Sequence, residues 1–393
     1  MKREYTRWFR IFIITLIVLL LIIGCEYTSE TKATAPVMPQ ASQQPTLKKT
    51  TPTSNPTPIP FDTKFAWFYK PPENIELLPQ NFDLFILTHK DEEERDQLQA
   101  MGVSAPIYQY LLLAEIREPE SCDDVPFGNQ VAYHIGDFCW ISAEHPDWFL
   151  LDQFGNRIGT KNGTYHMDPG NQGYREFWLS RAKEMQIKFG WEGIFIDNAE
   201  GSIFKFIKKG ALPKNYPNNS SYQIAVEGFL AYLRQSYFEP NGRPMYANIV
   251  STESNTVWQS YSQYLDGVMI EAFAVDWSTG YQSTKSWEAQ IALAEGALSQ
   301  GKKLILVSQG DKLDTKRQLF AYTSYLLVTN GNAAFRYANA DSYNQIWLYD
   351  NYLIDLGSPL NSRYKYGLSW RRDFENGYVI VNPSTHTGKI IVD

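Results

Sequence analysis

The chain has 393 residues, of which 44% are hydrophobic, 15% aromatic and 20% charged, and its formal net charge is −7 at pH 7. This is the composition of a globular protein, and the size leaves room for one large domain with additional segments. The basic residues form no stripe along the acidic chain, so nucleic acid is excluded as an expected partner.

The N-terminus carries an export signal. Its first ten residues include the basic side chains Lys2, Arg3, Arg7 and Arg10, and an apolar run follows from Ile11 to Ile23. A basic head, a short apolar segment and a small residue at its end are typical of a secretory signal peptide. The ending Ile22-Ile23-Gly24-Cys25 resembles the bacterial lipobox. We therefore predict a lipoprotein signal over residues 1–25 with Cys25 lipidated; an uncleaved anchor helix is the alternative.

Both alternatives place the rest of the chain outside the cytoplasm, attached to the bacterial cell membrane or envelope. Residues 26–61 are rich in Thr, Ser, Gln and Pro and almost without aromatic residues. Such a segment cannot bury enough apolar surface to fold, so we predict a disordered, semi-extended tether.

The remaining residues, from 62 onward, show a repeated alternation of two patterns. Eight short and nearly all-apolar runs have the pattern of parallel strands that are covered on both faces: Phe65–Tyr69, Phe82–Thr88, Pro106–Leu111, Gly193–Asp197, Met245–Ile249, Gly267–Glu271, Leu304–Ser308 and Ala333–Tyr337. Apolar residues at three- and four-residue steps, or a helix-favouring composition, predict helices between and after them: Asp91–Met101, Tyr174–Phe189, Tyr222–Tyr237, Trp287–Leu298, Arg317–Val328 and Tyr343–Leu356.

Eight strand–helix units favour closure into a barrel. We therefore predict an α/β protein with a (β/α)8 TIM barrel over residues 62–366, followed by a small β appendage over 367–393 that packs on the barrel. The segment 112–173 interrupts the repeat on the face where barrel enzymes carry their active-site loops. Cys122 and Cys139 lie in this excursion, and an oxidising compartment favours a disulfide between them.

Two of the apolar runs end in a carboxylate, Asp197 and Glu271. The carboxyl ends of strands are where α/β folds build active sites. Two acids on different strands predict a catalytic pair, and hydrolysis of glycosidic bonds is the commonest chemistry of this kind. A helix-capping or structural role is the alternative for Asp197. Glu115, just beyond the third strand, is a reserve acid.

Other residues near the predicted strand ends or on the loops beyond them offer amides, aromatic faces and a guanidinium, which suit a polyhydroxylated ligand. The candidate substrate-binding residues are Tyr110, Asp168, Asn198, Asn248, Phe273, Trp277, Gln309, Arg336 and Tyr337. Asp168 could equally form a structural turn, and Phe273 and Trp277 could equally be packing residues. The five histidines show no metal-ligand spacing, so neither metal nor cofactor is expected.

Three segments carry a resemblance to a known family. They are Tyr165–Asn171, Gly193–Asn198 and Arg372–Ser384. Together they resemble the glycosyl-hydrolase-like barrel family numbered fifteen, which is distantly similar to endo-α-1,4-polygalactosaminidases. The resemblance implies a (β/α)8 barrel and a hydrolase, with the strand-four aspartate and strand-six glutamate of that pattern at Asp197 and Glu271. The chain departs from the pattern at Tyr110–Glu115, where a polar, glycine-containing stretch is replaced.

The sequence thus predicts a monomeric, surface-anchored glycoside hydrolase that cleaves a polysaccharide or oligosaccharide. The placement of Asp197 and Glu271 resembles that of the catalytic acids in retaining barrel glycosidases. By this resemblance Asp197, at the end of the fourth strand, is the nucleophile, and Glu271, at the end of the sixth, is the acid/base. A carbohydrate-binding barrel lipoprotein without catalysis is the main alternative. A solute-binding lipoprotein would require two doubly wound lobes instead of eight repeated units. The sugar, the linkage and the choice between internal and terminal cleavage stay open.

Overall fold

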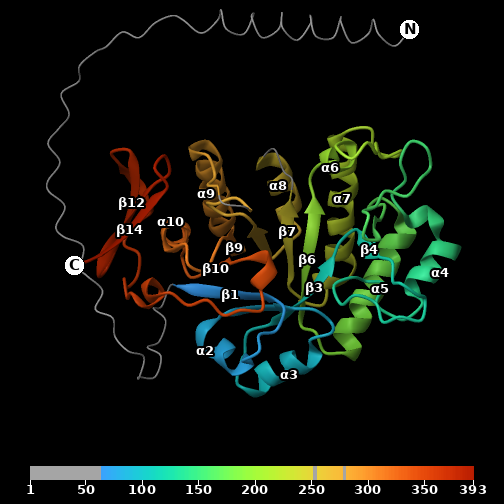
Figure 1. Ribbon diagram of the computed structural model, residues 1–393, viewed down its shortest axis with the longest axis horizontal. Coiled ribbons are helices and arrows are strands. Elements are labelled where there is room, and N and C mark those ends of the chain that lie inside the picture. The colour runs from blue at the N-terminus through green and yellow to red at the C-terminus, as the bar shows by residue number, and fades with distance from the viewer. Residues whose placement is uncertain (1–62, 251–254, 278–279) are drawn as a thin grey trace, which may run out of the picture. The chain divides into compact units, whose positions relative to one another are not determined.

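The computed structural model describes residues 63–250, 255–277 and 280–393 (Figure 1). The predicted signal, the lipidation site Cys25 and the predicted tether lie outside the described residues. Among the residues that are described, no helix is long and apolar enough to cross a membrane.

Eight parallel strands close into a barrel, with helices between them (Figure 1). Around the barrel the order is β1-β10-β9-β8-β7-β6-β3-β2, and β1 pairs with both β2 and β10. The strands are β1 (Lys64–Tyr69), β2 (Leu84–Leu87), β3 (Ile107–Leu112), β6 (Gly193–Glu200), β7 (Met245–Val250), β8 (Gly267–Ile270), β9 (Lys303–Gln309) and β10 (Ala333–Ala338). Each predicted strand is present, and the predicted (β/α)8 barrel is confirmed.

The larger helices cover the barrel: α3 (Glu92–Ala100), α5 (Gln172–Lys188), α7 (Asn219–Leu233), α8 (Asn255–Ser262), α9 (Thr284–Ser299) and α10 (Thr315–Leu326). Shorter elements are η1 (Ile75–Leu77), α2 (Leu78–Asn81), α6 (Phe204–Ile207) and η3, a π-helical turn at Arg234–Phe238 that extends α7. Four helices, α5, α7, α9 and α10, have an N-cap residue whose side chain accepts a hydrogen bond from a backbone N–H of the first turn. These residues are Asn171, Asn218, Ser283 and Asp314.

The predicted helix Tyr343–Leu356 is wrong. One 3-10 turn, η5 (Asp350–Leu353), forms within this range, and another, η4 (Ala340–Ser342), ends just before it. The carbonyl groups of Tyr343 and Gln345 accept hydrogen bonds from the buried Arg336 side chain, at 3.2 and 3.0 Å. A tertiary donor therefore satisfies carbonyls that a helix would pair with its own later N–H groups.

Residues of alternate parity face the inside and the outside of the barrel. The inside is filled by a cluster that includes Phe195 of β6, Tyr246 of β7 and Met269 of β8, with Tyr108 and Tyr110 of β3. Because side chains on a strand alternate with a period of two, residues 197, 248 and 271 follow the same inward parity one step closer to the carboxyl ends. The side chains of residues 197, 248 and 271 therefore point into the same opening, at the carboxyl end of the barrel.

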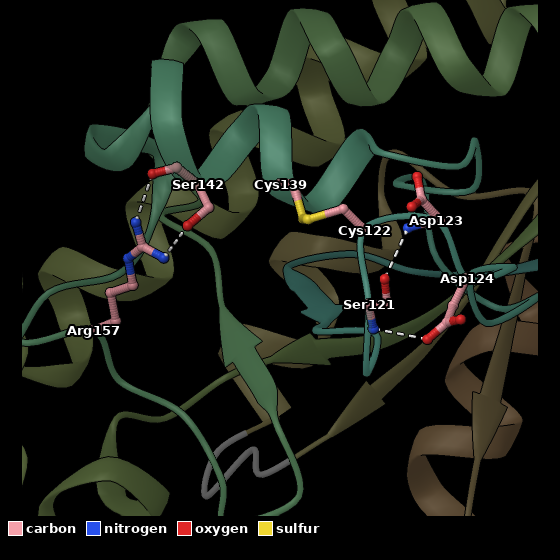
Figure 2. The surroundings of a disulfide bond; sticks show 7 residues. All are labelled: Ser121, Cys122, Asp123, Asp124, Cys139, Ser142 and Arg157. Carbon is pink, nitrogen blue, oxygen red and sulfur yellow. Dashed lines mark hydrogen bonds between the residues drawn. A yellow bond between two sulfur atoms is a disulfide. The ribbon is translucent and has the colours of Figure 1, made fainter.

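The excursion after β3 forms a small substructure of its own. Strand β4 (Glu115–Arg117) pairs antiparallel with β5 (Thr164–His166), and α4 (Asp137–Glu144) and η2 (Pro146–Trp148) lie between them in sequence. A disulfide joins Cys122 to Cys139, with their Cα atoms 5.9 Å apart (Figure 2). The Arg157 guanidinium donates to Oγ and O of Ser142 on α4, at 2.8 and 2.9 Å (Figure 2). Both links tie α4 to other parts of this long irregular segment.

The C-terminal residues form a four-stranded antiparallel sheet, β11 (Tyr364–Tyr366), β12 (Ser369–Phe374), β13 (Gly377–Asn382) and β14 (Thr387–Val392). The sheet lies against α10: the Arg372 guanidinium donates to the carbonyls of Leu326 and Thr329, at 3.0 and 2.6 Å. At Gly388 a Cβ atom would lie 1.9 Å from Thr323 Oγ1 on α10, so only glycine permits this approach.

Candidate active site

Three neighbouring strands place Asp197, Asn248 and Glu271 together at the carboxyl end of the barrel. The Asn248 amide nitrogen donates to Asp197 Oδ1 at 3.0 Å and to Glu271 Oε2 at 2.8 Å. Since both oxygens bind one nitrogen, they lie no more than about 6 Å apart. The two predicted acids therefore share one site, and Asn248, predicted as a substrate contact, bridges them.

Each acid is followed directly by a residue in the left-handed backbone region: Asn198 has φ 57° and Ala272 has φ 56°. Asparagine tolerates this conformation, whereas alanine adopts it at a cost of about 1–2 kcal/mol. The pairing of β6 with β7 also shifts register between Ile196 and Ala199. Strained backbone that persists at such positions clusters at functional sites. Here it turns the chain immediately after each carboxylate and leaves both side chains at the barrel mouth.

Tyrosines surround the two carboxylates. The Tyr110 hydroxyl donates to Asp197 Oδ2, and the Tyr69 ring stacks on that of Tyr110 with centroids 5.1 Å apart. On the other side, the Tyr343 hydroxyl donates to Glu271 Oε1 at 3.4 Å and accepts a hydrogen bond from the Gln309 side chain. Tyr110 and Gln309 were expected near the site, and the structure brings both there. Tyr69 and Tyr343 were not predicted.

Burial and mutual repulsion perturb the acids differently. Burial, and then the negative charge of Asp197, raise the pKa of Glu271 to about 8, against the hydrogen bonds from Asn248 and Tyr343. Burial also raises the pKa of Asp197, but three donors favour its ionised form: the Tyr110 hydroxyl, the Asn248 amide and the Asn198 backbone N–H. The pair therefore titrates as a unit, with the proton held preferentially on Glu271 near neutral pH.

A second charged cluster lies beside the pair. Glu115 Oε1 binds His166 Nδ1 at 3.2 Å and Lys205 Nζ at 3.3 Å, and Lys205 also binds Glu200 Oε2 at 2.7 Å. Hydrogen bonds and charge from His166 and Lys205 outweigh burial and lower the pKa of Glu115 to about 2. The Asn198 side chain donates to Glu115 Oε2 at 3.4 Å. Glu115, the predicted reserve acid, is thus an ionised residue that helps hold the segment following Asp197.

The structure assigns other roles to four of the predicted substrate-binding residues. Phe273 is fully buried, so its ring offers no face to a sugar, and the prediction of a stacking role is wrong. Asp168 is buried, with its carboxylate accepting from Tyr216 Oη, Asn215 Nδ2 and the Gly170 N–H, which is the structural turn considered as the alternative.

Arg336 and Tyr337 are also buried. The Arg336 guanidinium lies 4.1 Å from the Trp67 ring centroid and donates to loop carbonyls, and the Tyr337 hydroxyl donates to the Asp311 carbonyl at 3.2 Å. Both side chains support loops and do not reach an open site. Trp277, in contrast, is 54% exposed on the segment after β8 and remains available as an aromatic platform.

Within the described ranges, no group of three or more His, Cys, Asp and Glu side chains could hold a metal ion. The chemistry available at the mouth is that of two carboxyl groups, one with a strongly raised pKa, surrounded by hydroxyl and amide donors.

A family model described as hypothetical glycosyl hydrolase family 15 matches residues 104–378. The chain belongs to this family. A search of curated proteins found no sequence that matches this family-15 protein.

Two solved structures are similar to this family-15 protein at low sequence identity. The glycoside hydrolase domain of PelA from Pseudomonas aeruginosa is similar with a TM-score of 0.50 and 15% identity, over 73% of this chain and 97% of that one. The maltogenic α-amylase AmyB from Thermotoga neapolitana gives a TM-score of 0.42 and 13% identity, over 74% and 67% of the two chains. At 15% identity, the likeness to the PelA domain shows the barrel fold alone.

Proposed function

We propose that this family-15 protein cleaves a polysaccharide by a two-carboxylate mechanism with retention of configuration. One observation carries the proposal: Asp197 and Glu271, on two different strands, are hydrogen-bonded to one amide nitrogen at the barrel mouth. Carboxyl groups about 5–5.5 Å apart suit a retaining mechanism, whereas inverting pairs stand about 6.5–9.5 Å apart to admit a water molecule. The limit of about 6 Å between the two bound oxygens favours retention.

The environments of the two acids divide their roles. Asp197 accepts three hydrogen bonds that favour its anion, so it is the nucleophile that attacks the anomeric carbon. Glu271 holds a proton near neutral pH and gives it to the glycosidic oxygen as the bond to the leaving sugar breaks. The resulting Glu271 carboxylate then takes a proton from water. The hydroxide so formed attacks the anomeric carbon and displaces Asp197, which restores both groups.

A panel of polysaccharides incubated with the purified protein tests the proposal, with release of reducing ends as the readout. Galactosamine-containing polymers belong in the panel because of the resemblance to endo-α-1,4-polygalactosaminidases. We expect at least one polymer to be cut, and we expect Asp197→Asn and Glu271→Gln each to abolish the cut while the protein stays folded. Activity at the wild-type level in either variant would remove that residue from the mechanism. Binding without cutting by the wild type would favour the carbohydrate-binding alternative.

We further propose that the protein works on the outer side of the membrane, held by a lipid on Cys25. The basic head, the apolar run and Ile22-Ile23-Gly24-Cys25 support this, as does the proline-rich segment 26–61. Growth with an alkyne-tagged fatty acid should label the wild-type chain and leave a Cys25→Ser variant unlabelled. Equal labelling of the two would refute the anchor.

A further inference from the structure

A groove runs along the barrel mouth outside the two-acid site. Its volume is about 620 Å³, within the range of ligand-binding pockets. The loop after β1 forms one wall with Glu73, Asn74 and Leu77, and the loop after β10 forms another with Asn344 and Leu348. Lys312, from the loop after β9, also lines it.

We propose that this groove binds further sugar units of the polysaccharide whose bond is cut between Asp197 and Glu271. The inference rests on the proposed function and adds to it a second binding region. With such a region the protein binds several consecutive sugar units, as expected for an enzyme that cuts inside a chain.

The position of the groove supports this. Strands β9, β10 and β1 are consecutive in the barrel, and β9 is the direct neighbour of β8, which precedes Glu271. Tyr343, whose hydroxyl donates to Glu271, directly precedes the wall residue Asn344. Tyr69, which stacks on the tyrosine bound to Asp197, precedes the other wall. The rings of Tyr69 and Tyr343 also contact each other, with centroids 5.8 Å apart. Both walls therefore start from the tyrosines that surround the acids.

The chemistry of the lining matches a sugar chain. The side chains of Asn74 and Asn344 are exposed and make no hydrogen bond to any part of the chain that the structure describes. Their amides are free to donate to and accept from hydroxyl groups. Leu77 and Leu348 are 39% and 52% exposed beside them, which gives apolar surface for the faces of sugar rings. A sugar chain with many hydroxyl groups uses both kinds of contact.

The wall that carries Asn344 is held in place before any ligand arrives. The buried Arg336 guanidinium binds the carbonyls on both sides of Asn344, those of Tyr343 and Gln345. The Trp347 indole N–H donates to Gln345 Oε1 at 3.0 Å. Binding to a preformed loop avoids the entropy cost of ordering it.

Affinity electrophoresis through gels that contain each polysaccharide of the panel tests the groove. The full chain carries Glu271→Gln, so that no polymer is consumed during the run. Asn344→Ala removes the amide from one wall and Asn74→Ala from the other. Gln99→Ala, on the exposed surface of α3, is the matched control. We expect at least one polymer to retard the Glu271→Gln protein, and each groove variant to weaken that binding about fivefold to tenfold, as loss of one or two hydrogen bonds predicts.

Retardation that is equal in the groove variants and the control would overturn the inference, and so would the absence of retardation by every polymer. Two groove variants from opposite walls guard against a local folding defect in either one. The proposed function is judged separately, by reducing ends released by the wild type. If the wild type cuts a polymer while groove and control variants bind it equally, only the groove fails. If nothing is cut but the groove variants lose binding, only the catalytic proposal fails.

Discussion

Replacing Asp197 by asparagine should lower the pKa of Glu271. The change removes a negative charge whose oxygen lies within about 6 Å of a Glu271 oxygen. With an effective dielectric constant of about 20, two such charges interact by about 3 kcal/mol, which corresponds to about a hundredfold change in the acid dissociation constant. Both side chains are partly open to the mouth, and water screens the interaction. We therefore expect the proton on Glu271 to be bound between about tenfold and a hundredfold more weakly in Asp197→Asn.

The assay is NMR titration of protein labelled with 13C at the glutamate carboxyl carbon, with Glu271→Gln to assign the resonance. The wild-type resonance should titrate near pH 8, and that of Asp197→Asn at lower pH. It should still titrate above the ordinary glutamate value, because burial is the larger cause of the shift. Asp123→Asn, an exposed carboxylate in the excursion, removes the same charge as a control. If the Glu271 titration is the same in Asp197→Asn and wild type, the two acids do not interact, and the reasoning about their shared proton is refuted.

Further outcomes follow from the same contacts. In Tyr343→Phe the hydrogen bond that favours the Glu271 anion is lost, so the pKa of Glu271 rises and the alkaline limb of the pH profile of kcat/KM moves to higher pH; an unmoved limb would contradict this. Folded Glu271 titrates at about 8 against an ordinary 4.5, so wild-type stability falls as pH rises between these values; Glu271→Gln should therefore melt higher than wild type at pH 9, and the gap should close toward pH 4.5. Folded Glu115 titrates at about 2, so it stabilises the fold above pH 4.5; Glu115→Gln should unfold with about 3 kcal/mol less free energy at pH 7, and calorimetry should show the difference shrinking as pH falls toward 2. Replacing Cys122 and Cys139 by serine opens a loop with a sequence separation of 17 residues, which should lower stability by about 3 kcal/mol in denaturant titrations and leave reducing-end release intact.

The sequence predicts the barrel because its signals are local. A parallel strand covered on both faces is a short apolar run, and each of the eight runs forms its strand. The positions of Asp197 and Glu271 at strand ends follow from the same runs. The C-terminal sheet is predicted in part: the β appendage over 367–393 contains two short apolar runs, Tyr378–Val381 and Ile390–Val392, which lie in β13 and β14. Strands β11 and β12 show no strand pattern in the sequence, because Tyr364–Tyr366 is exposed and Ser369–Phe374 is largely polar.

The loops at the mouth could not be predicted in the same way. Tyr343 was assigned to a helix, and its contact with Glu271 depends on Arg336, a tertiary partner that holds the loop carbonyls. Phe273 is an aromatic residue just beyond a strand end, where a ring could stack on a sugar, yet it packs into the core. The one available signal for Tyr343 was its place, a few residues beyond the carboxyl end of the last strand, where barrel sites are built.

What the sequence determined by itself is therefore the set of strands and the two acids that the strand ends carry. Only the tertiary structure decided that Asn248 holds both acids within about 6 Å, that Glu271 keeps its proton, and that a groove lies between the loops after β1 and β10. The reason is physical. Apolar periodicity is read from adjacent residues, whereas distances, burial and hydrogen bonds between strand ends exist only after the barrel has closed.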